Sequence, residues 1–500
     1  MTYSNLPVNL ELTTLNGVYP SSMLDGLDNL VKSSTVELDY VSSQTEQAEQ
    51  IKKALLTQGV HDEGNAQCVN ILYPGRFCQN SAMGWLYYTG KHWTQAGAEE
   101  QLERKTTETL TARARIALDS GEADRYKDLI TKSIPNASKV QAAISQLSSL
   151  VYAPAETFDT NPDMLNCQNG VVDLRTGELL SHSPDQRFTY CVPVDYIPMA
   201  PNRTWVEWLN RAVGKEATDY LQLAGGYSAT GHTREEVLFY LFGPPRSGKG
   251  TFTETLLAVL GSPLAKEVNF QTFTAQRTGD SQNFDLAPLK PCRFVAASES
   301  NVYERFNEAK VKALTGGNEI YCAFKHRDHF GYRPQFKIWL STNQPVNADP
   351  DDDAVWSRLR VVEFPDSHLG KEDKRLKERM KSAAVLEGVL AWIVEGARRW
   401  YALGSTGLPE PASSASIKNL HRGALDNVQA WIDESCLVGG NGFAVGSILY
   451  LSYEKWCHEN GIEPKKHKGF TQSLERKKFE ATITKRDGKT VRGYRGIGLS

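Results

Sequence analysis

The chain has 500 residues, a formal net charge of -3 and 40% hydrophobic residues. This length exceeds what one hydrophobic core supports and predicts several domains of roughly 100 to 200 residues each. The near-neutral charge excludes a uniformly basic nucleic-acid binder, so any basic surface has to be local. No C-x-x-C pair occurs among the eight cysteines, which argues against zinc ribbons and for reduced thiols in the cytoplasm. Because no signal peptide and no apolar run of about 18 residues is found, we expect no membrane segment.

The chain begins with residues 1–62, whose role is not readable, although residues 41–59 have the pattern of a helix that ends at a glycine. We expect residues 63–200 to form an α+β domain. The spacing of its apolar residues predicts helices over residues 98–119, 124–134 and 138–151.

A hairpin is predicted over residues 84–95, where two short aromatic runs flank a Thr-Gly turn. Its rings could stack on nucleic-acid bases. Only Lys91 and His92 are basic in this stretch, so we favour rings that pack into a small domain core.

Short strands with tight turns are predicted over residues 165–196. Asp173 and Glu178 in this stretch resemble a carboxylate pair, but each is next to a turn and no third group completes a site. We therefore interpret both as structural residues.

The stretch that organises the chain is Val237–Leu260, which follows a helix predicted over residues 205–224. It consists of an apolar β-run, a glycine-bearing loop and an apolar helical pattern, and the loop fits G-x-x-x-x-G-K. Glycines let backbone N–H groups face phosphates, and the helix start adds a positive dipole end. The residues expected to bind ATP are Gly243, Pro244, Pro245, Arg246, Ser247, Gly248, Lys249, Gly250 and Thr251.

Within this loop, Lys249 is expected to reach the β- and γ-phosphate oxygens. The usual pattern places Ser or Thr directly after the lysine to hold Mg²⁺. Here Gly250 intervenes, and we assign the magnesium ligand to Thr251, because the first helical turn can still aim its hydroxyl at the metal.

Polar residues follow two further predicted strands. Glu299 comes after the buried run 292–298 and is the candidate magnesium partner or catalytic base. Ser298 occupies the position where many such enzymes have a first acid, so the choice between these two roles stays open. Asn343 follows the buried run 336–342 and can reach the γ-phosphate and the attacking water.

A fourth strand is predicted over residues 356–364, with Arg358 at its start. An arginine in this place can complete a neighbouring subunit's site and contribute on the order of 10³ to 10⁵ in rate. The alternative is a surface arginine paired with one of the acids at 351–353, and the sequence leaves the two readings equally open.

Taken in order, GPPRSGKGT, RFVAASE, AKVKALTGGNEI, FKIWLSTNQP and WSRLRVVEF resemble the viral and plasmid superfamily-three helicases. The chain is most similar to the helicase part of phage and plasmid primase-helicases, which are related to the poxvirus replicative enzyme. Lys249 would then match the phosphate lysine, Glu299 the acidic strand motif, Asn343 the sensor and Arg358 the arginine supplied in trans. Ser357 and Asn318 depart from the family pattern.

The resemblance implies a multidomain α/β protein with an AAA+-type P-loop ATPase core over residues 201–407. A hairpin predicted over residues 321–336 would project into a central channel and grip DNA, because its tip is basic. The tip residues are Lys325, His326 and Arg327. Cys322, His326 and His329 lack a fourth partner, so we reject a metal site there.

A helix over residues 371–400 suits a small lid, and residues 408–415 read as a linker. Beyond it, residues 417–500 predict a winged-helix domain, with helices over 427–437, 446–460 and 467–479 and a hairpin over 481–499. Basic residues are concentrated in this domain and imply DNA contact. The residues assigned to this contact are Lys477, Lys478, Lys485 and Arg486.

From these features we expect an ATP- and Mg²⁺-dependent DNA helicase of phage, plasmid or mobile-element replication, acting on single-stranded and forked DNA in a bacterial or archaeal host. We expect a homo-oligomeric ring, with a hexamer as the working count, and a separate primase or polymerase. The alternatives are an origin-binding initiator or loader that uses ATP for assembly, and a helicase with residual primase activity. A small-molecule phosphotransferase would need neither the basic hairpin nor the winged helix.

Overall fold

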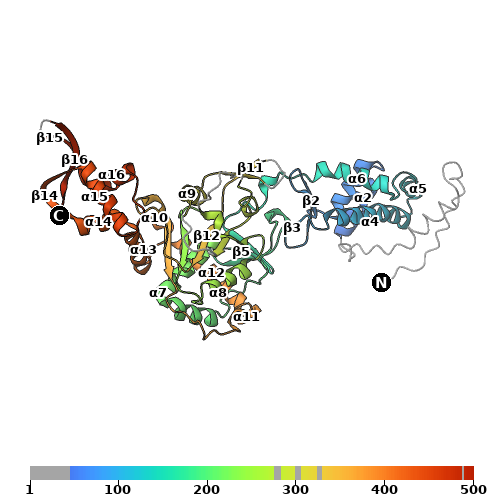
Figure 1. The fold of residues 1–500 in the computed structure, drawn as a ribbon. Helices are drawn as coiled ribbons and strands as arrows, with labels where there is room; N and C mark the ends of the chain where they lie inside the picture. The colour runs from blue at the N-terminus through green and yellow to red at the C-terminus, as the bar shows by residue number, and fades with distance from the viewer. Residues whose placement is uncertain (1–45, 275–282, 299–305, 324–328, 487–488) are drawn as a thin grey trace. The chain divides into compact units, whose positions relative to one another are not determined.

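The computed structural model describes residues 46–274, 283–298, 306–323, 329–486 and 489–500 (Figure 1). The chain divides into two compact units and is multidomain, as its length predicts. The first unit comprises Met1–Pro162, Asn166–Val172 and Leu179–Cys191, and the second comprises Asp163–Leu165, Asp173–Glu178 and Val192–Ser500.

The first unit is mainly helical. Its helices are α2 (Glu46–Thr57), α3 (Asp62–Leu72), α4 (Ala98–Asp119), α5 (Ala123–Lys132) and α6 (Ala137–Leu150). The predicted helices over 98–119, 124–134 and 138–151 are confirmed, whereas α3 was not predicted. Arg113 of α4 is fully buried and donates to the backbone carbonyls of Leu55, Gln58 and Gly59, which fixes the end of α2 to α4.

A small antiparallel sheet, β1 (Phe77–Asn80), β2 (Gly84–Tyr88) and β3 (Trp93–Thr94), completes this unit. The predicted hairpin over residues 84–95 is confirmed, because Tyr88 pairs with Trp93. These two rings are 6% and 5% exposed and lie 5.5 Å apart, so they pack the core as expected rather than face solvent. The strands β4 (Met164–Cys167), β5 (Gly170–Asp173) and β6 (Glu178–Leu180) form a further three-stranded sheet in the order β4-β5-β6.

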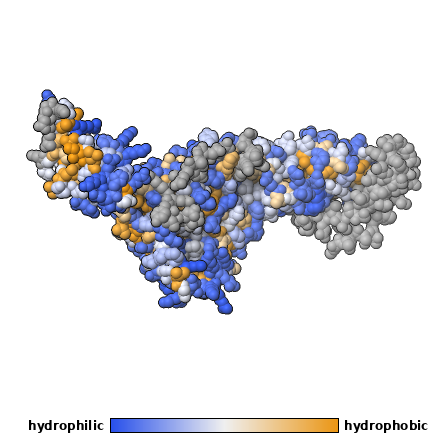
Figure 2. Space-filling model, viewed as in Figure 1, coloured by the Kyte–Doolittle hydropathy of each residue, from blue (hydrophilic) through white to orange (hydrophobic). Residues whose placement is uncertain are grey.

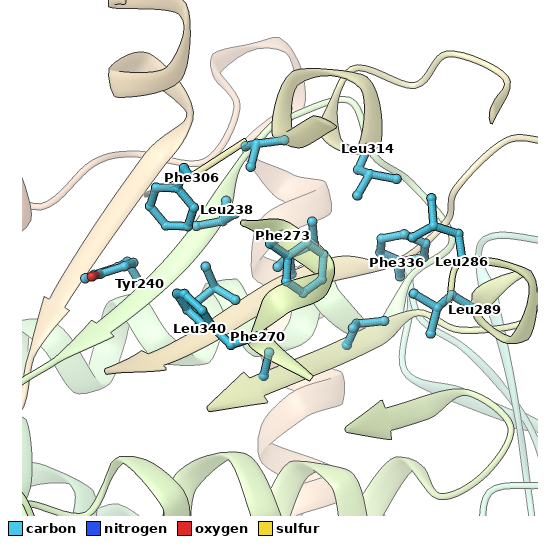
Figure 3. Packing of buried hydrophobic residues seen from close by; sticks show 14 of the residues in the cluster. Leu238, Tyr240, Phe270, Phe273, Leu286, Leu289, Phe306, Leu314, Phe336 and Leu340 are labelled. Atoms are coloured by element: carbon cyan, nitrogen blue, oxygen red, sulfur yellow. The ribbon is translucent and has the colours of Figure 1, made fainter. Parts of the chain in front are cut away.

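The second unit is built on a parallel five-stranded sheet in the order β13-β7-β12-β9-β8. Its strands are β7 (Leu238–Phe242), β8 (Ala265–Asn269), β9 (Phe294–Ser298), β12 (Lys337–Thr342) and β13 (Leu359–Glu363). The central strands are buried apolar runs, which is typical of parallel sheets covered on both faces. One face packs the cluster of Figure 3, in which Leu238 and Leu340 of the sheet meet Phe270 and Phe273.

The other face of the sheet is covered by α7 (Arg203–Ala229), α8 (Lys249–Leu260) and α12 (Ala383–Ala402). Phe252 of α8 lies 5.3 Å from the ring of Trp339 and 5.8 Å from that of Trp205. Helices α7 and α12 approach so closely that a Cβ at Gly226 would lie 2.0 Å from the backbone nitrogen of Ala397. This helical layer holds the start of α8 in place.

Three predicted elements of the second unit were wrong in part. The run 356–364 begins as a helix, α10 (Asp353–Arg358), and only β13 is a strand, because Asp352 caps that helix. Residues 371–375 are not helical, and the predicted lid helix is divided into α11 (Leu376–Met380) and α12 by an extended Ser382. The predicted linker already contains the start of α13 (Ala412–Leu425), whose His421 packs on Phe242.

The C-terminal module, residues 427–500, follows the order α14 (Asn427–Ser435), β14 (Cys436–Val445), α15 (Gly446–Glu459), α16 (His467–Arg476), β15 (Glu480–Arg486) and β16 (Lys489–Leu499). Its three helices and its hairpin were predicted, and β14 was not. Strand order is β14-β16-β15. Trp431, Tyr453 and Phe470 form its core, while Leu437 and Ile483 are more than 60% exposed. Figure 2 shows hydrophobic residues gathered on the surface of this module. Over the described residues, no helix combines the length and the apolar character needed to cross a bilayer.

Candidate functional site

The site begins at the loop that joins β7 to α8. Gly243 has φ 147° and Gly248 has φ 109°, a region that favours glycine. A Cβ at Gly243 would lie 2.1 Å from the carbonyl oxygen of Phe364, and one at Gly248 would lie 3.2 Å from the ring of Trp208. Both glycines of the sequence pattern are therefore required by close packing, and they leave the start of α8 open.

Lys249, the first residue of α8, is 7% exposed, and its ammonium group lies among four oxygen acceptors. It donates to the carbonyl oxygens of Gly243 (2.8 Å) and Pro244 (2.9 Å), to Ser247 Oγ (3.1 Å) and to Asn343 Oδ1 (3.0 Å). Burial lowers the pKa of Lys249 from 10.5 to about 8. Sequence reasoning proposed Lys249 and Asn343 separately, and the fold brings them into contact.

A cavity of about 880 Å³ opens at this point, between the carboxyl ends of β7, β9 and β12. Ligands of open parallel sheets bind at this edge, and the volume suits a small molecule or cofactor. Its lining includes predicted residues from Pro245 to Thr251 and Asn343. The lining residues that sequence reasoning did not assign are Trp208, Arg211, Ala212, Ser298, Ser341, Thr342, His368, Lys371, Glu372, Asp373, Lys374, Leu376, Lys377 and Arg379.

Positive charge dominates this lining. Among the described residues of the lining, seven are basic and two, Glu372 and Asp373, are acidic. The basic residues are Arg211, Arg246, Lys249, Lys371, Lys374, Lys377 and Arg379. Lys377 forms an ion pair with Glu254 of α8, and Arg379 pairs with Asp373 at 2.8 Å. Such a concentration of cations at the start of a helix attracts a polyanion.

Two observations test whether a nucleotide and its metal fit this cavity. Among the described residues, Ser341 Oγ is buried without a hydrogen-bond partner, and it lies in the cavity lining beside Thr251. Gly243 and Gly248 place no side chain at the two positions of the loop where a Cβ would meet Phe364 and Trp208, and glycine-bearing loops before a helix are typical of phosphate sites. The donor set of hydroxyls, an amide and cations therefore fits a phosphate chain with a divalent cation.

Glu299, the predicted acidic partner, lies outside the described residues. The strand that precedes it, β9, is not next to β7, because β12 lies between them. Ser298 at the end of β9 lines the cavity. The carboxyl end of β9 is therefore separated by β12 from the loop that follows β7.

Arg358 lies at the amino end of β13, and β13 runs parallel to β7 with Leu359 opposite Leu238. Its Nη2 donates to Glu236 at 2.6 Å and its Nη1 to the carbonyl oxygen of Ala354 at 2.8 Å. Lys249 follows the carboxyl end of β7, so the length of the strand, about 16 Å, separates the two cations along the sheet. The alternative partners of Arg358 at 351–353 are wrong, because the guanidinium pairs with Glu236.

The residues predicted to contact DNA differ in their exposure to solvent. Lys478 and Lys485 are exposed, whereas Lys477 is 17% exposed and pairs with Asp426, so it is not available on the surface. Lys325, His326, Arg327 and the side chain of Arg486 lie outside the described residues. The flanking strands β10 (Ile320–Ala323) and β11 (His329–Tyr332) pair as an antiparallel hairpin, as predicted.

The cavity residues on α7 and in the segment 368–379 were not predicted from the sequence. These segments are far apart in the chain, and only the fold brings them to the same cavity. Trp208 and Arg211 are one helical turn apart on α7, which is the only signal that places them on one face. Within the described residues, Lys371 and Lys374 form no ion pair. The sequence analysis placed both at the charged start of a predicted helix and assigned them no role in a site.

Comparison with known proteins gives two family matches. Residues 66–214 match the family described as D5 N terminal like, and residues 241–358 match a family of unknown function. The solved structure of the NrS-1 C terminal region aligns with a TM-score of 0.41 and 11% identity, covering 72% of this chain and 90% of that one. We draw nothing from a likeness at that level.

Curated relatives come from large DNA viruses. "Putative helicase L207/L206" of Acanthamoeba polyphaga mimivirus is 25% identical over 306 residues, which is 56% of this chain and 32% of that protein. "Putative primase C962R" of African swine fever virus is 23% identical over 238 residues, or 44% and 25%. "Putative helicase 022R" of Frog virus 3 is 30% identical over 152 residues, or 29% and 15%. The chain thus spans a third or less of the length of these relatives.

The fold and the cavity define a multidomain α/β protein with a parallel sheet and a cavity lined by basic residues at its carboxyl edge. The names of the matched relatives point to viral replication proteins. These matches relate the chain to viral helicases and primases, which confirms the resemblance found in its motifs.

Proposed function

We propose that this chain is an ATP-dependent DNA helicase of viral or mobile-element replication. The observation that supports this most directly is the contact of Lys249 with Asn343 at the mouth of the cationic cavity. A lysine at the start of α8 and a polar amide just after the adjacent strand β12 can hold the γ-phosphate from two sides and orient the attacking water. The names of the viral relatives support the same activity.

ATP would bind with its phosphates at Ser247 to Lys249, where the helix start and the lysine offset their charge. Mg²⁺ would be held by Thr251 and Glu299, and it supplies charge neutralisation between the phosphates. Asn343 would position the water, and the cations from 371–379 would exclude bulk solvent and hold the polyphosphate. Asn343 Oδ1 accepts from the Lys249 ammonium, so a γ-phosphate bound there would compete with Asn343 for this donor.

Arg358 would act on the nucleotide of a neighbouring subunit in a homo-oligomeric ring, with a hexamer as the working count. Its placement at the amino edge of the sheet supports this role, since it cannot reach the loop of its own subunit. Glu236, which holds Arg358, is then a positioning residue. Its φ of 51° is in the left-handed region, a strain that is common where backbone geometry is set by function.

DNA would be bound by two elements. The hairpin at residues 321–336 would contact the translocating single strand through Lys325, His326 and Arg327. The C-terminal module, which we interpret as a winged-helix domain from its α-β-α-α-β-β order, would contact duplex or forked DNA through Lys478 and Lys485. A separate primase or polymerase would supply primers.

Subunit mixing tests this proposal sharply. Lys249→Ala removes the site of one subunit, and Arg358→Ala removes the arginine offered to the next. Each variant alone should have no ATPase activity stimulated by single-stranded DNA. Mixed rings should regain part of it, because some interfaces pair an intact site with an intact arginine. Mixtures that stay inactive, although both proteins form rings of native mass, would refute the in-trans role.

A second candidate function is an initiator or loader that uses ATP only for assembly. The observation that favours it is the cationic C-terminal module, which suits origin binding. Unwinding of a forked duplex by the wild-type chain, lost in Lys249→Ala, distinguishes the helicase from the loader. Turnover that needs no DNA, together with no unwinding, would favour the loader.

A further inference from the structure

One buried carboxylate, Asp351, collects three donors from the C-terminal module. Its side chain is 15% exposed and accepts from Lys465 Nζ and from Ser473 Oγ. Arg476 Nη1 donates to the backbone oxygen of Asp351 and lies 3.8 Å from its Oδ1. The pKa of Asp351 is lowered by these partners against the opposing effect of burial, so it stays ionised.

The three donors form a preassembled set. Ser473 and Arg476 are three residues apart on α16 and share one face of it, and Lys465 precedes that helix. Lys465 Nζ also lies 3.4 Å from Ser473 Oγ, and Ser473 is fully buried. An ammonium, a hydroxyl and a guanidinium are the groups that proteins use on DNA phosphates. A carboxylate resembles a phosphodiester in presenting two oxygens and one negative charge.

We propose that Lys465, Ser473 and Arg476 form a binding site for a DNA phosphodiester, which Asp351 occupies as an internal competitor. DNA then has to displace Asp351 before this face of α16 can engage the backbone. This inference rests on the proposed contact of the C-terminal module with DNA, and it adds three residues and a masking group to it.

The neighbouring acids show that the 349–353 loop does not need Asp351 to keep its place. Asp352 pairs with Lys312 of α9 (Glu308–Thr315) at 2.9 Å, and Asp353 pairs with Arg422 of α13. Asp349 only supplements Asp351, at 3.5 Å from Lys465. Removing the Asp351 carboxylate should therefore free the donors of α16 and leave the loop anchored at its other end.

The test compares Asp351→Asn with Asp353→Asn, a matched control from the same loop whose partner is not on α16. Binding of the full chain to a fluorescent 20-base-pair duplex is measured over a series of salt concentrations. Asp351→Asn should bind about tenfold tighter at low salt, because duplex no longer has to displace a competing carboxylate. Its salt slope should match the wild type, since the same two cations contact phosphates in both proteins. Asp353→Asn should match the wild type. Equal affinity in both variants would overturn the inference.

Two further measurements guard against a folding artefact. Lys465→Ala with Arg476→Ala, added to Asp351→Asn, should remove the gain while leaving wild-type affinity. In the wild-type chain, carbodiimide labelling of Asp351 should rise several-fold when duplex is added, and unchanged labelling would overturn the inference. If Lys478→Ala with Lys485→Ala abolishes binding but Asp351→Asn changes nothing, this inference fails alone. If no variant binds duplex, the proposed DNA contact fails with it.

Discussion

Burial of the Lys249 ammonium lowers the free energy of unfolding of the protein when no nucleotide is added. The variant Lys249→Met should therefore be more stable than the wild type. Methionine keeps the length and apolar stem of the side chain and removes the charge. Burial holds the pKa of Lys249 at about 8, against 10.5 for an ordinary lysine. A shift of this size corresponds to about 3 kcal/mol at most, from roughly 1.4 kcal/mol per pH unit. We expect about half of it, because the group lies at the wall of a solvent-filled cavity.

The sign follows from proton linkage. Below pH 8 both states bind the proton, and the native state carries the full cost. Between pH 8 and 10.5 the unfolded chain binds more protons, so wild-type stability rises with pH relative to Lys249→Met. Unfolding of both proteins in urea at pH 7.5 and 9.5, without nucleotide, should show the advantage of the variant shrinking by about 1–2 kcal/mol. A difference that does not depend on pH would refute the inferred pKa shift.

Because the pKa of Lys249 is about 8, the lysine loses its charge as pH rises above 8, and the affinity for a fluorescent ATP analogue should fall over the same range. Lys249→Met should not bind the analogue at any pH. Gly243→Ala places a Cβ 2.1 Å from the carbonyl oxygen of Phe364 and should lower stability by roughly 2–4 kcal/mol, measured by thermal unfolding; a change under about 0.5 would show that the loop relaxes. Arg358→Ala should keep ATP binding and lose at least about 10³-fold in turnover. Lys325→Ala with His326→Ala should spare basal ATPase activity and abolish unwinding of a fork, and unchanged unwinding would remove the hairpin from the mechanism.

The sheet could be predicted where its strands are buried on both faces. Leu238–Phe242 is a continuous apolar run, and Lys337–Thr342 has an apolar centre at Ile338–Leu340. Short runs of this kind are typical of strands in a parallel sheet that is covered on both faces. The edge strand β8, Ala265–Asn269, was missed because its residues alternate between buried and exposed and include two charges. Strand β14 was missed because its three glycines mask the strand pattern.

The candidate site residues could be predicted because they lie at or near the ends of predicted strands. The side chains that they contact could not be predicted in the same way. The contact of Lys249 with Asn343 follows from two parallel neighbours ending at one edge, so a motif could indicate it. The pair of Arg358 with Glu236 joins residues 122 positions apart, and no local pattern signals it. The helix α13 was taken for a linker because its first turn is rich in serine and follows two prolines, a composition that signals turns unless packing decides.

Strand β7 leads at one end into the loop that we propose binds ATP, and it follows Glu236, the partner of Arg358, at the other. A single inserted or deleted residue within its five positions would rotate every side chain to the opposite face of the sheet. It would also change the spacing between the two ends by about 3.3 Å, so both the nucleotide pocket and the subunit contact would fail together. Natural variation in length should therefore be absent from this strand and confined to the loops that follow α8 and β9.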